Sequence, residues 1–185
     1  MTTVHRGYIF HIAGSPLVTE AVDHLEHFPD GALVVDDAGI IQWCGNWAEL
    51  PAEHASAKVV DHHGAFLLPG FIDTHMHFPQ VWCGDSYGGG QLLEWLNNCI
   101  FPSESRFEDE AYAKKAAVEW VDRMITAGTT NGLIFGSAFP HAQDLLFEEA
   151  RNRGLRIIAG RGIQTTGPES GARLMTSEAE AIELT

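Results

Sequence analysis

Two histidines separated by one residue are the clearest chemical feature of the sequence. They lie in Phe71–His77, which reads Phe-Ile-Asp-Thr-His-Met-His and has the composition of a strand. Alternate side chains of a strand lie on one face, so Asp73, His75 and His77 are expected together. Neighbouring neutral imidazoles can bind one zinc ion, and Asp73 could fix the tautomer of an imidazole by a hydrogen bond. The alternative is that both histidines are simply polar residues leaving a strand.

Helices and strands are expected to alternate after this segment. Asp109 is a typical N-cap for a helix that Gly128 ends, and the apolar residues between them recur at helical spacing: Ala113, Ala117, Trp120, Val121 and Met124. A second helix has Ala142, Leu145, Leu146 and Ala150 on one face, and further strands are expected at 132–136 and 155–160. This order predicts a parallel sheet, in which functional groups gather at the C-terminal ends of the strands.

Residues 1–68 have the pattern of a β domain. Short strands are expected at 7–12, 32–35, 40–43 and 58–60, with Asp36-Asp37-Ala38-Gly39 as a hairpin connection. Pairing them gives a small antiparallel sheet, whose apolar face another layer must cover. We therefore expect residues 1–68 to be part of a layered β domain, and residues 69–185 to be of α/β type.

Charge and cysteine content limit the classes of partner. The 185 residues include 11 Lys and Arg against 25 Asp and Glu, a net charge of −14, which argues against binding nucleic acid or an anionic membrane. A neutral or cationic small molecule suits this charge better. Three widely spaced cysteines argue against a disulfide framework, and the N-terminus lacks the uninterrupted apolar core of a signal peptide. The expected location is the cytoplasm.

The third βα unit looks unfinished. Ser177 and Glu180 have the spacing of a capping box, which predicts a helix from Glu178 close to the last residue, Thr185. Residues 69–185 are also too few for a closed eight-unit barrel, which takes ~250 residues. The sheet is therefore either small and open or part of a longer, truncated barrel.

The run Leu67–Gln80 resembles the first barrel strand of the amidohydrolase superfamily, specifically of guanine deaminases. Further segments similar to that family follow in order, namely Leu92–Leu96, Phe101–Glu104, Arg106–Asp109, Gly128–Thr130 and Leu146–Ala150. The similarity is close from about Ala65 to Gly160, and residues 1–64 fit loosely the β part that precedes the barrel. The resemblance implies the first three βα units of a TIM-like (β/α)8 metal-dependent hydrolase barrel, preceded by part of a small β-sandwich.

The resemblance also implies an activity and site residues. His75 and His77 would be the first two ligands of one zinc ion per subunit, Gln80 would hydrogen-bond the purine edge, and Trp95 would line the base pocket. From the residues alone, Gln80 is a loop residue and Trp95 belongs to a helix core. The implied reaction is hydrolytic deamination of guanine to xanthine and ammonia by a homodimer. The acid–base glutamate and the other ligands are expected beyond residue 185, so this chain alone should be inactive.

Two segments depart from the family pattern and keep other functions open. His141 lies two positions away from the histidine that family members often have before a proline, and we expect it in a surface loop. Residues 161–170 replace a Met-Asp-Arg-Asn type of segment. The alternatives are an amidohydrolase acting on another amino-heterocycle (another purine, a pyrimidine or a triazine), and a non-catalytic truncated fragment.

Three other polar or glycine-rich segments are assigned no chemistry. Asp61-His62-His63-Gly64 is expected to be an exposed turn, and Gly88-Gly89-Gly90 a flexible connection without the Lys-Ser/Thr of a phosphate loop. Residues 104–110 are expected to form a solvated entrance to the following helix.

Overall fold

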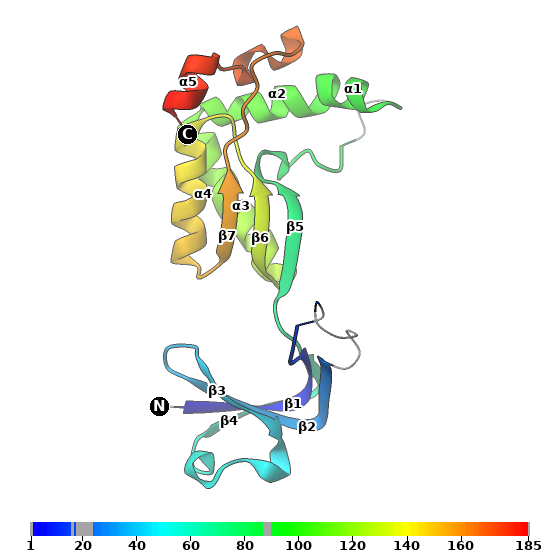
Figure 1. Cartoon of the computed structure of the whole chain (residues 1–185), viewed down its shortest axis with the longest axis vertical. Coiled ribbons are helices and arrows are strands. Elements are labelled where there is room, and N and C mark those ends of the chain that lie inside the picture. The colour runs from blue at the N-terminus through cyan, green and yellow to red at the C-terminus, as the bar shows by residue number, and fades with distance from the viewer. Residues whose placement is uncertain (1, 16, 18–23, 87–89, 185) are drawn as a thin grey trace. The chain divides into compact units, whose positions relative to one another are not determined.

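The chain divides into two compact units, Met1–Pro69 and Gly70–Thr185 (Figure 1). The computed structural model describes residues 2–15, 17, 24–86 and 90–184. The expectation for Gly88-Gly89-Gly90 falls mostly outside these ranges, so it stays a prediction. No helix in the described ranges is both long and apolar enough to cross a membrane.

The first unit is a four-stranded sheet in the order β3-β2-β1-β4. Its strands are β1 (Thr2–Ile12), β2 (Leu25–Asp36), β3 (Ile41–Asn46) and β4 (Lys58–Leu67). The hairpin between β2 and β3 is confirmed: the Asp36 carboxylate accepts the backbone N–H groups of Ala38 and Ile40, both at 2.9 Å, and Gly39 has a φ of 78°.

The expected all-antiparallel sheet is wrong, because β4 pairs with β1 in parallel. Two short 3₁₀ turns, Trp47–Glu49 and Ala52–His54, follow β3, and the chain then returns to the far edge of the sheet beside β1. A buried cluster of Val4, Ala32 and Val34, with Trp43 and Trp47 packed on it, forms the core of this unit.

The expected turn at residues 61–64 is also wrong, although Asp61, His63 and Gly64 are exposed as foreseen. These residues belong to β4, since Asp61 pairs with Arg6 of β1 and the pairing resumes at Phe66. Gly64, with a φ of 87°, lies where the register between the two strands shifts. A glycine accommodates that irregularity without ending the strand.

The second unit has three parallel strands in the order β5-β6-β7, as expected. They are β5 (Phe71–His77), β6 (Thr129–Phe135) and β7 (Arg156–Gly160). The longer helices α3 (Glu110–Thr126) and α4 (Pro140–Asn152) form the crossovers (Figure 1). The Ser177–Glu180 capping box is confirmed at the start of α5 (Glu178–Glu183).

A series of short helical segments lies between β5 and α3. These are η4 (Phe78–Gln80), α1 (Leu92–Trp95), η5 (Leu96–Ile100), α2 (Phe101–Glu104) and η6 (Ser105–Glu108), while η7 (Glu169–Leu174) precedes α5. They lie beyond the C-terminal end of β5, which is the end that carries His75 and His77 (Figure 1).

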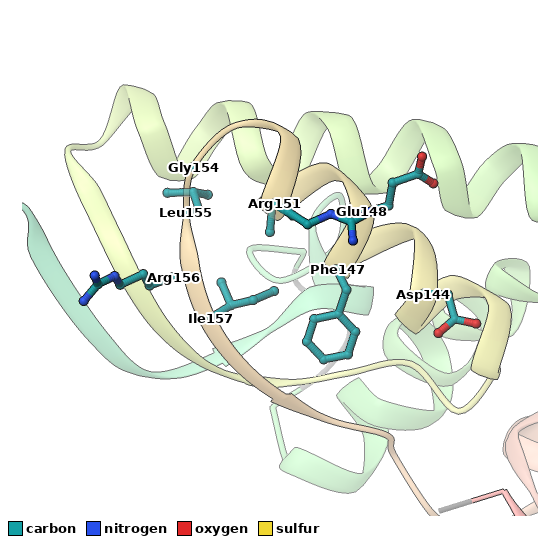
Figure 2. Close-up of a pocket in the computed structure, with 9 residues that line it drawn as sticks. Asp144, Phe147, Glu148, Arg151, Gly154, Leu155, Arg156 and Ile157 are labelled. Atoms are coloured by element: carbon teal, nitrogen blue, oxygen red, sulfur yellow. The ribbon is translucent and has the colours of Figure 1, made fainter. Parts of the chain in front are cut away.

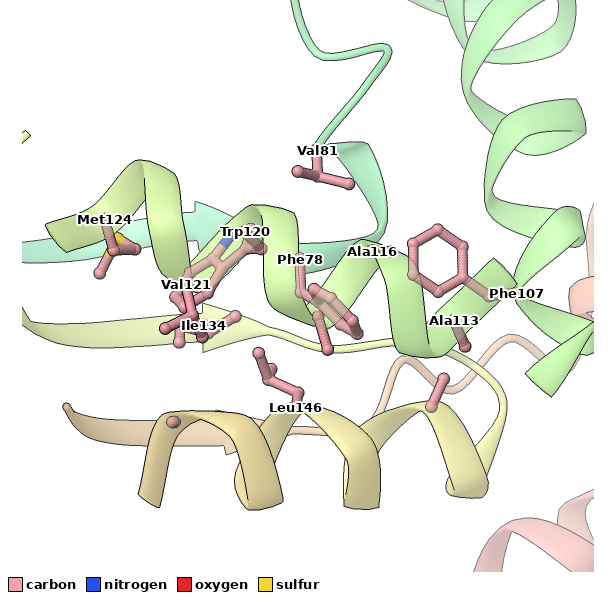
Figure 3. Close-up of a cluster of buried hydrophobic side chains, with 13 residues drawn as sticks. Phe78, Val81, Phe107, Ala113, Ala116, Trp120, Val121, Met124, Ile134 and Leu146 are labelled. Atoms are coloured by element: carbon pink, nitrogen blue, oxygen red, sulfur yellow. The ribbon is translucent and has the colours of Figure 1, made fainter. Parts of the chain in front are cut away.

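The core of this unit lies between the helices and one face of the sheet (Figure 3). All five apolar residues expected on α3 are buried, as are Ala142, Leu146 and Ala150 of α4. Ile134 of β6 contributes from the sheet, whereas its neighbours Leu133 and Phe135 are exposed on the opposite face. The side chains that follow β5 join this core through Phe78, so the end of β5 is anchored by packing.

The Asp109 cap gives a first testable prediction. Its carboxylate accepts the backbone N–H groups of Ala111 at 2.8 Å and Tyr112 at 3.1 Å. Asp109→Ala should lower the free energy of unfolding by ~1 kcal/mol, because these donors lose their partner. Urea unfolding measures the change, and Asp109→Asn, which keeps the acceptor, is the matched control. An unchanged stability in the alanine variant would contradict the assigned cap.

Candidate active site

His75 and His77 lie at the C-terminal end of β5 on the same face of the sheet. Their ring centroids are 5.4 Å apart, and both rings contact Phe135 of β6, at 5.1 and 4.7 Å. The alternation of a strand therefore brings the two imidazoles together, as the spacing predicts. Partial burial lowers the pKa of His77, and the neighbouring His75 lowers it further. The neutral imidazole that this favours is the form that binds a metal.

Asp73 has a different partner from the one expected. Its carboxylate accepts the backbone N–H of His75 at 2.9 Å instead of a ring N–H. The bond spans two residues, the local pattern that aspartate commonly forms with its own backbone. Asp73 thus fixes the backbone at the first histidine and not the tautomer of an imidazole.

A cavity of about 470 Å³ brings three of the predicted site residues together. His75, His77 and Gln80 all line it, together with Asp73 and Arg123. A larger cavity of about 620 Å³ lies at the opposite edge of the sheet, between α4 and β7 (Figure 2). Its lining includes Asp144, Glu148 and Arg151 but no histidine, so the smaller cavity is the better candidate for metal chemistry.

Gln80 is held by a carboxylate that the sequence did not single out. Its side-chain nitrogen donates to Oε1 of Glu104 at 3.1 Å. The expectation that residues 104–110 are solvated is wrong for Glu104, which is half-buried next to the buried Ser105. Burial raises the pKa of the Glu104 carboxyl, and the hydrogen bond from Gln80 opposes this rise. The sequence contains one signal for the burial of Glu104, which is its position three residues before the apolar Phe107.

Trp95 is the fourth residue that the sequence analysis predicted for the site. Trp95 ends α1, and its indole N–H donates to the carbonyl of Ser86 at 2.6 Å. Among the described residues it does not line the 470 Å³ cavity, so its role at a base pocket stays a prediction.

The prediction that His141 lies in a surface loop is wrong. His141 lies in the first turn of α4, where Nε2 donates to the carbonyl of Phe107 at 2.9 Å.

The donor set fits part of a zinc site. Imidazole nitrogen is a preferred zinc ligand, and two of them stand side by side on a strand that packing holds in place. Protein zinc sites use three or four protein ligands. Within the described ranges no group of three or more His, Cys, Asp or Glu side chains is arranged to hold a metal. His75 and His77 thus fit two positions of a site that needs further ligands.

Several proteins are similar to this chain in sequence. A probable guanine deaminase of Deinococcus radiodurans is 43% identical over 162 residues, which cover 85% of this chain and 36% of that protein. The guanine deaminase of Escherichia coli is 38% identical over 145 residues, 77% of this chain and 32% of that protein. The chain thus spans about a third of the length of these curated relatives.

Solved structures and a family model agree with these relatives. The crystal structure of guanine deaminase from Bradyrhizobium japonicum matches with a TM-score of 0.87 and 32% identity, covering 100% of this chain and 39% of that one. The E. coli guanine deaminase structure gives 0.83 and 31%, covering 100% and 41%. The model of the amidohydrolase family matches residues 66–184, which include β5, the histidine pair, Gln80 and Glu104. The chain therefore belongs to the amidohydrolase family.

Proposed function

We propose that this chain supplies part of the active site of a zinc-dependent guanine deaminase, which hydrolyses guanine to xanthine and ammonia. The observation that carries the proposal is the pairing of His75 and His77 at the end of β5, in one cavity with Gln80. The names of the two relatives and two solved structures described above support guanine as the substrate. A free purine base also suits a chain with a net charge of −14 better than a nucleic-acid polymer does.

Each residue of this site has a proposed task. His75 and His77 hold the zinc ion, one per subunit, from alternate positions at the end of β5. When bound, zinc supplies Lewis-acid activation of water, which hydrolysis of a C–N bond requires. Gln80 orients the base, because an amide offers both a donor and an acceptor, and Trp95 lines the base pocket. The remaining ligands and the acid–base glutamate are proposed to come from segments outside these 185 residues, in a cytoplasmic homodimer.

A chimeric enzyme tests this proposal. The chain would replace the corresponding N-terminal segment of the D. radiodurans relative, with which it is 43% identical over 162 residues. Ammonia release from guanine, adenine, cytosine and melamine is then measured in the presence of zinc. We expect turnover of guanine by the chimera and none by the 185-residue chain alone, because its two ligands leave the zinc site incomplete.

Two outcomes would overturn this proposal. A folded chimera that releases ammonia only from the pyrimidine or the triazine would favour the second candidate, an amidohydrolase of another amino-heterocycle. The unusual segment at residues 161–170 is the observation that favours that candidate. Guanine turnover by the 185-residue chain alone, lost on His75→Ala, would show that the site is complete without any further segment.

A further inference from the structure

We propose that Glu104 is a positioning residue that fixes the orientation of the Gln80 amide and so sets which base the cavity accepts. This inference rests on the proposed function, in which Gln80 contacts the base. It adds a residue, an orientation and a basis for specificity to that function.

The contact joins two elements that are distant in the sequence. Gln80 is the last residue of η4, directly after the strand that carries the histidine pair, and Glu104 is the last residue of α2. The Gln80 nitrogen lies 3.1 Å from Oε1 of Glu104, and both side chains are half-buried. Glu104 thus connects the helical segments at residues 92–108 to Gln80, which lines the cavity.

The chemistry of a carboxylate makes the contact directional. An ionised carboxylate only accepts hydrogen bonds, whereas an amide has a nitrogen that donates and an oxygen that accepts. The nitrogen of Gln80 must face Glu104, because the reverse orientation would place two acceptors against each other. One N–H and the carbonyl oxygen of Gln80 then remain for a ligand, in a fixed spatial order.

That fixed order can distinguish bases of the same size. Guanine has an acceptor at its C6 oxygen and a donor at N1, whereas 2,6-diaminopurine has a donor at C6 and an acceptor at N1. A site arranged to pair with one order leaves polar groups unpaired with the other, which is costly in a desolvated cavity. Glutamine at position 104 would remove the constraint, because an amide there can accept from or donate to Gln80.

The surroundings of Glu104 argue against a merely structural role. Ile100 and Phe107 are 1% and 0% exposed, so this carboxylate stands beside a packed core. Burial raises the pKa of the Glu104 carboxyl, and the hydrogen bond from Gln80, which favours the ionised form, opposes this rise. Stability therefore falls as the pH rises from the ordinary glutamate range through the raised pKa, and ionised Glu104 costs stability above that range. A neutral glutamine of the same shape should fold at least as stably.

The first arm of the test uses the 185-residue chain labelled with ¹⁵N-glutamine. The side-chain NH₂ signals of Gln80 are those that Gln80→Leu removes. We expect Glu104→Gln to shift these signals and leave the melting temperature unchanged or raised. Glu108→Gln is the matched control, since Glu108 is exposed and pairs with Arg173 at 3.1 Å. Gln80 signals that are insensitive to Glu104→Gln would overturn the inference.

The second arm measures base selection in the chimeric enzyme. Glu104→Gln is expected to raise the KM for guanine and to strengthen inhibition by 2,6-diaminopurine, changing the ratio of the two affinities about tenfold, with kcat less affected. A parent chimera without guanine turnover would defeat the proposed function itself. A parent chimera that turns over guanine, with a Glu104→Gln variant of unchanged selection, would defeat only the role of Glu104.

Discussion

His77→Ala is expected to abolish guanine deamination in the chimeric enzyme, with a loss of kcat/KM of more than about a hundredfold. Even the partners of metal ligands typically contribute roughly 10–100-fold to affinity or activity, so a direct ligand should contribute more. His77 is the last residue of β5, and its ring lies 5.4 Å from that of His75. Without it, one imidazole remains on the strand, and the zinc ion loses the geometry that the pair provides.

Zinc content provides a reading that does not depend on turnover. The parent chimera should retain about one zinc ion per subunit after gel filtration, as expected for a catalytic site of this type, and the His77→Ala variant should lose it. His63→Ala is the matched control, because His63 is an exposed histidine of β4 that pairs with Asp61 at 2.6 Å. Full zinc content and full turnover in the His77→Ala variant would contradict the assignment of this ligand.

Local patterns predicted the second unit well, because its elements are determined largely by neighbouring residues. Strand β5 has the expected bounds, Phe71–His77, since Pro69-Gly70 precedes it and Phe78-Pro79-Gln80 follows it. Helix α3 starts after the Asp109 cap, and Gly128, with a φ of 76°, lies just beyond its end. The side-by-side placement of the two histidines followed from the same alternation.

Contacts between distant residues account for part of the errors. Strand β4 continues through residues 61–64 because it pairs with β1, although its own sequence has the composition of a turn. Glu104 is half-buried because α2 packs beside η4, and His141 is in a helix that begins at Pro140. The pairing of β4 could not be predicted from residue spacing. For the other two features the sequence held a local signal, because Glu104 lies three residues before the apolar Phe107 and His141 directly follows Pro140, the first residue of α4.

Phe107→Ala is expected to lower the free energy of unfolding of the second unit by about 3–5 kcal/mol. Phe107 is 0% exposed and contacts Phe78 and Tyr112 edge-on, at 5.1 and 5.2 Å. Its carbonyl also accepts the Nε2–H of His141. Removing the ring would leave a cavity where η4, η6 and α3 meet. Domains typically have a stability of only about 5–15 kcal/mol, so this one change should remove a large part of it.

Urea unfolding followed by tryptophan fluorescence measures this loss, with Phe147→Ala as the control. Phe147 is 40% exposed on α4, so truncating it should cost clearly less. Equal losses in the two variants would contradict the assignment of Phe107 to the core. The change should also affect the candidate site, because Phe78 directly follows His77 and lies two residues before Gln80. In the chimeric enzyme, loss of the ring that packs against Phe78 should loosen the end of β5, so the affinity for zinc should fall at urea concentrations below the unfolding transition.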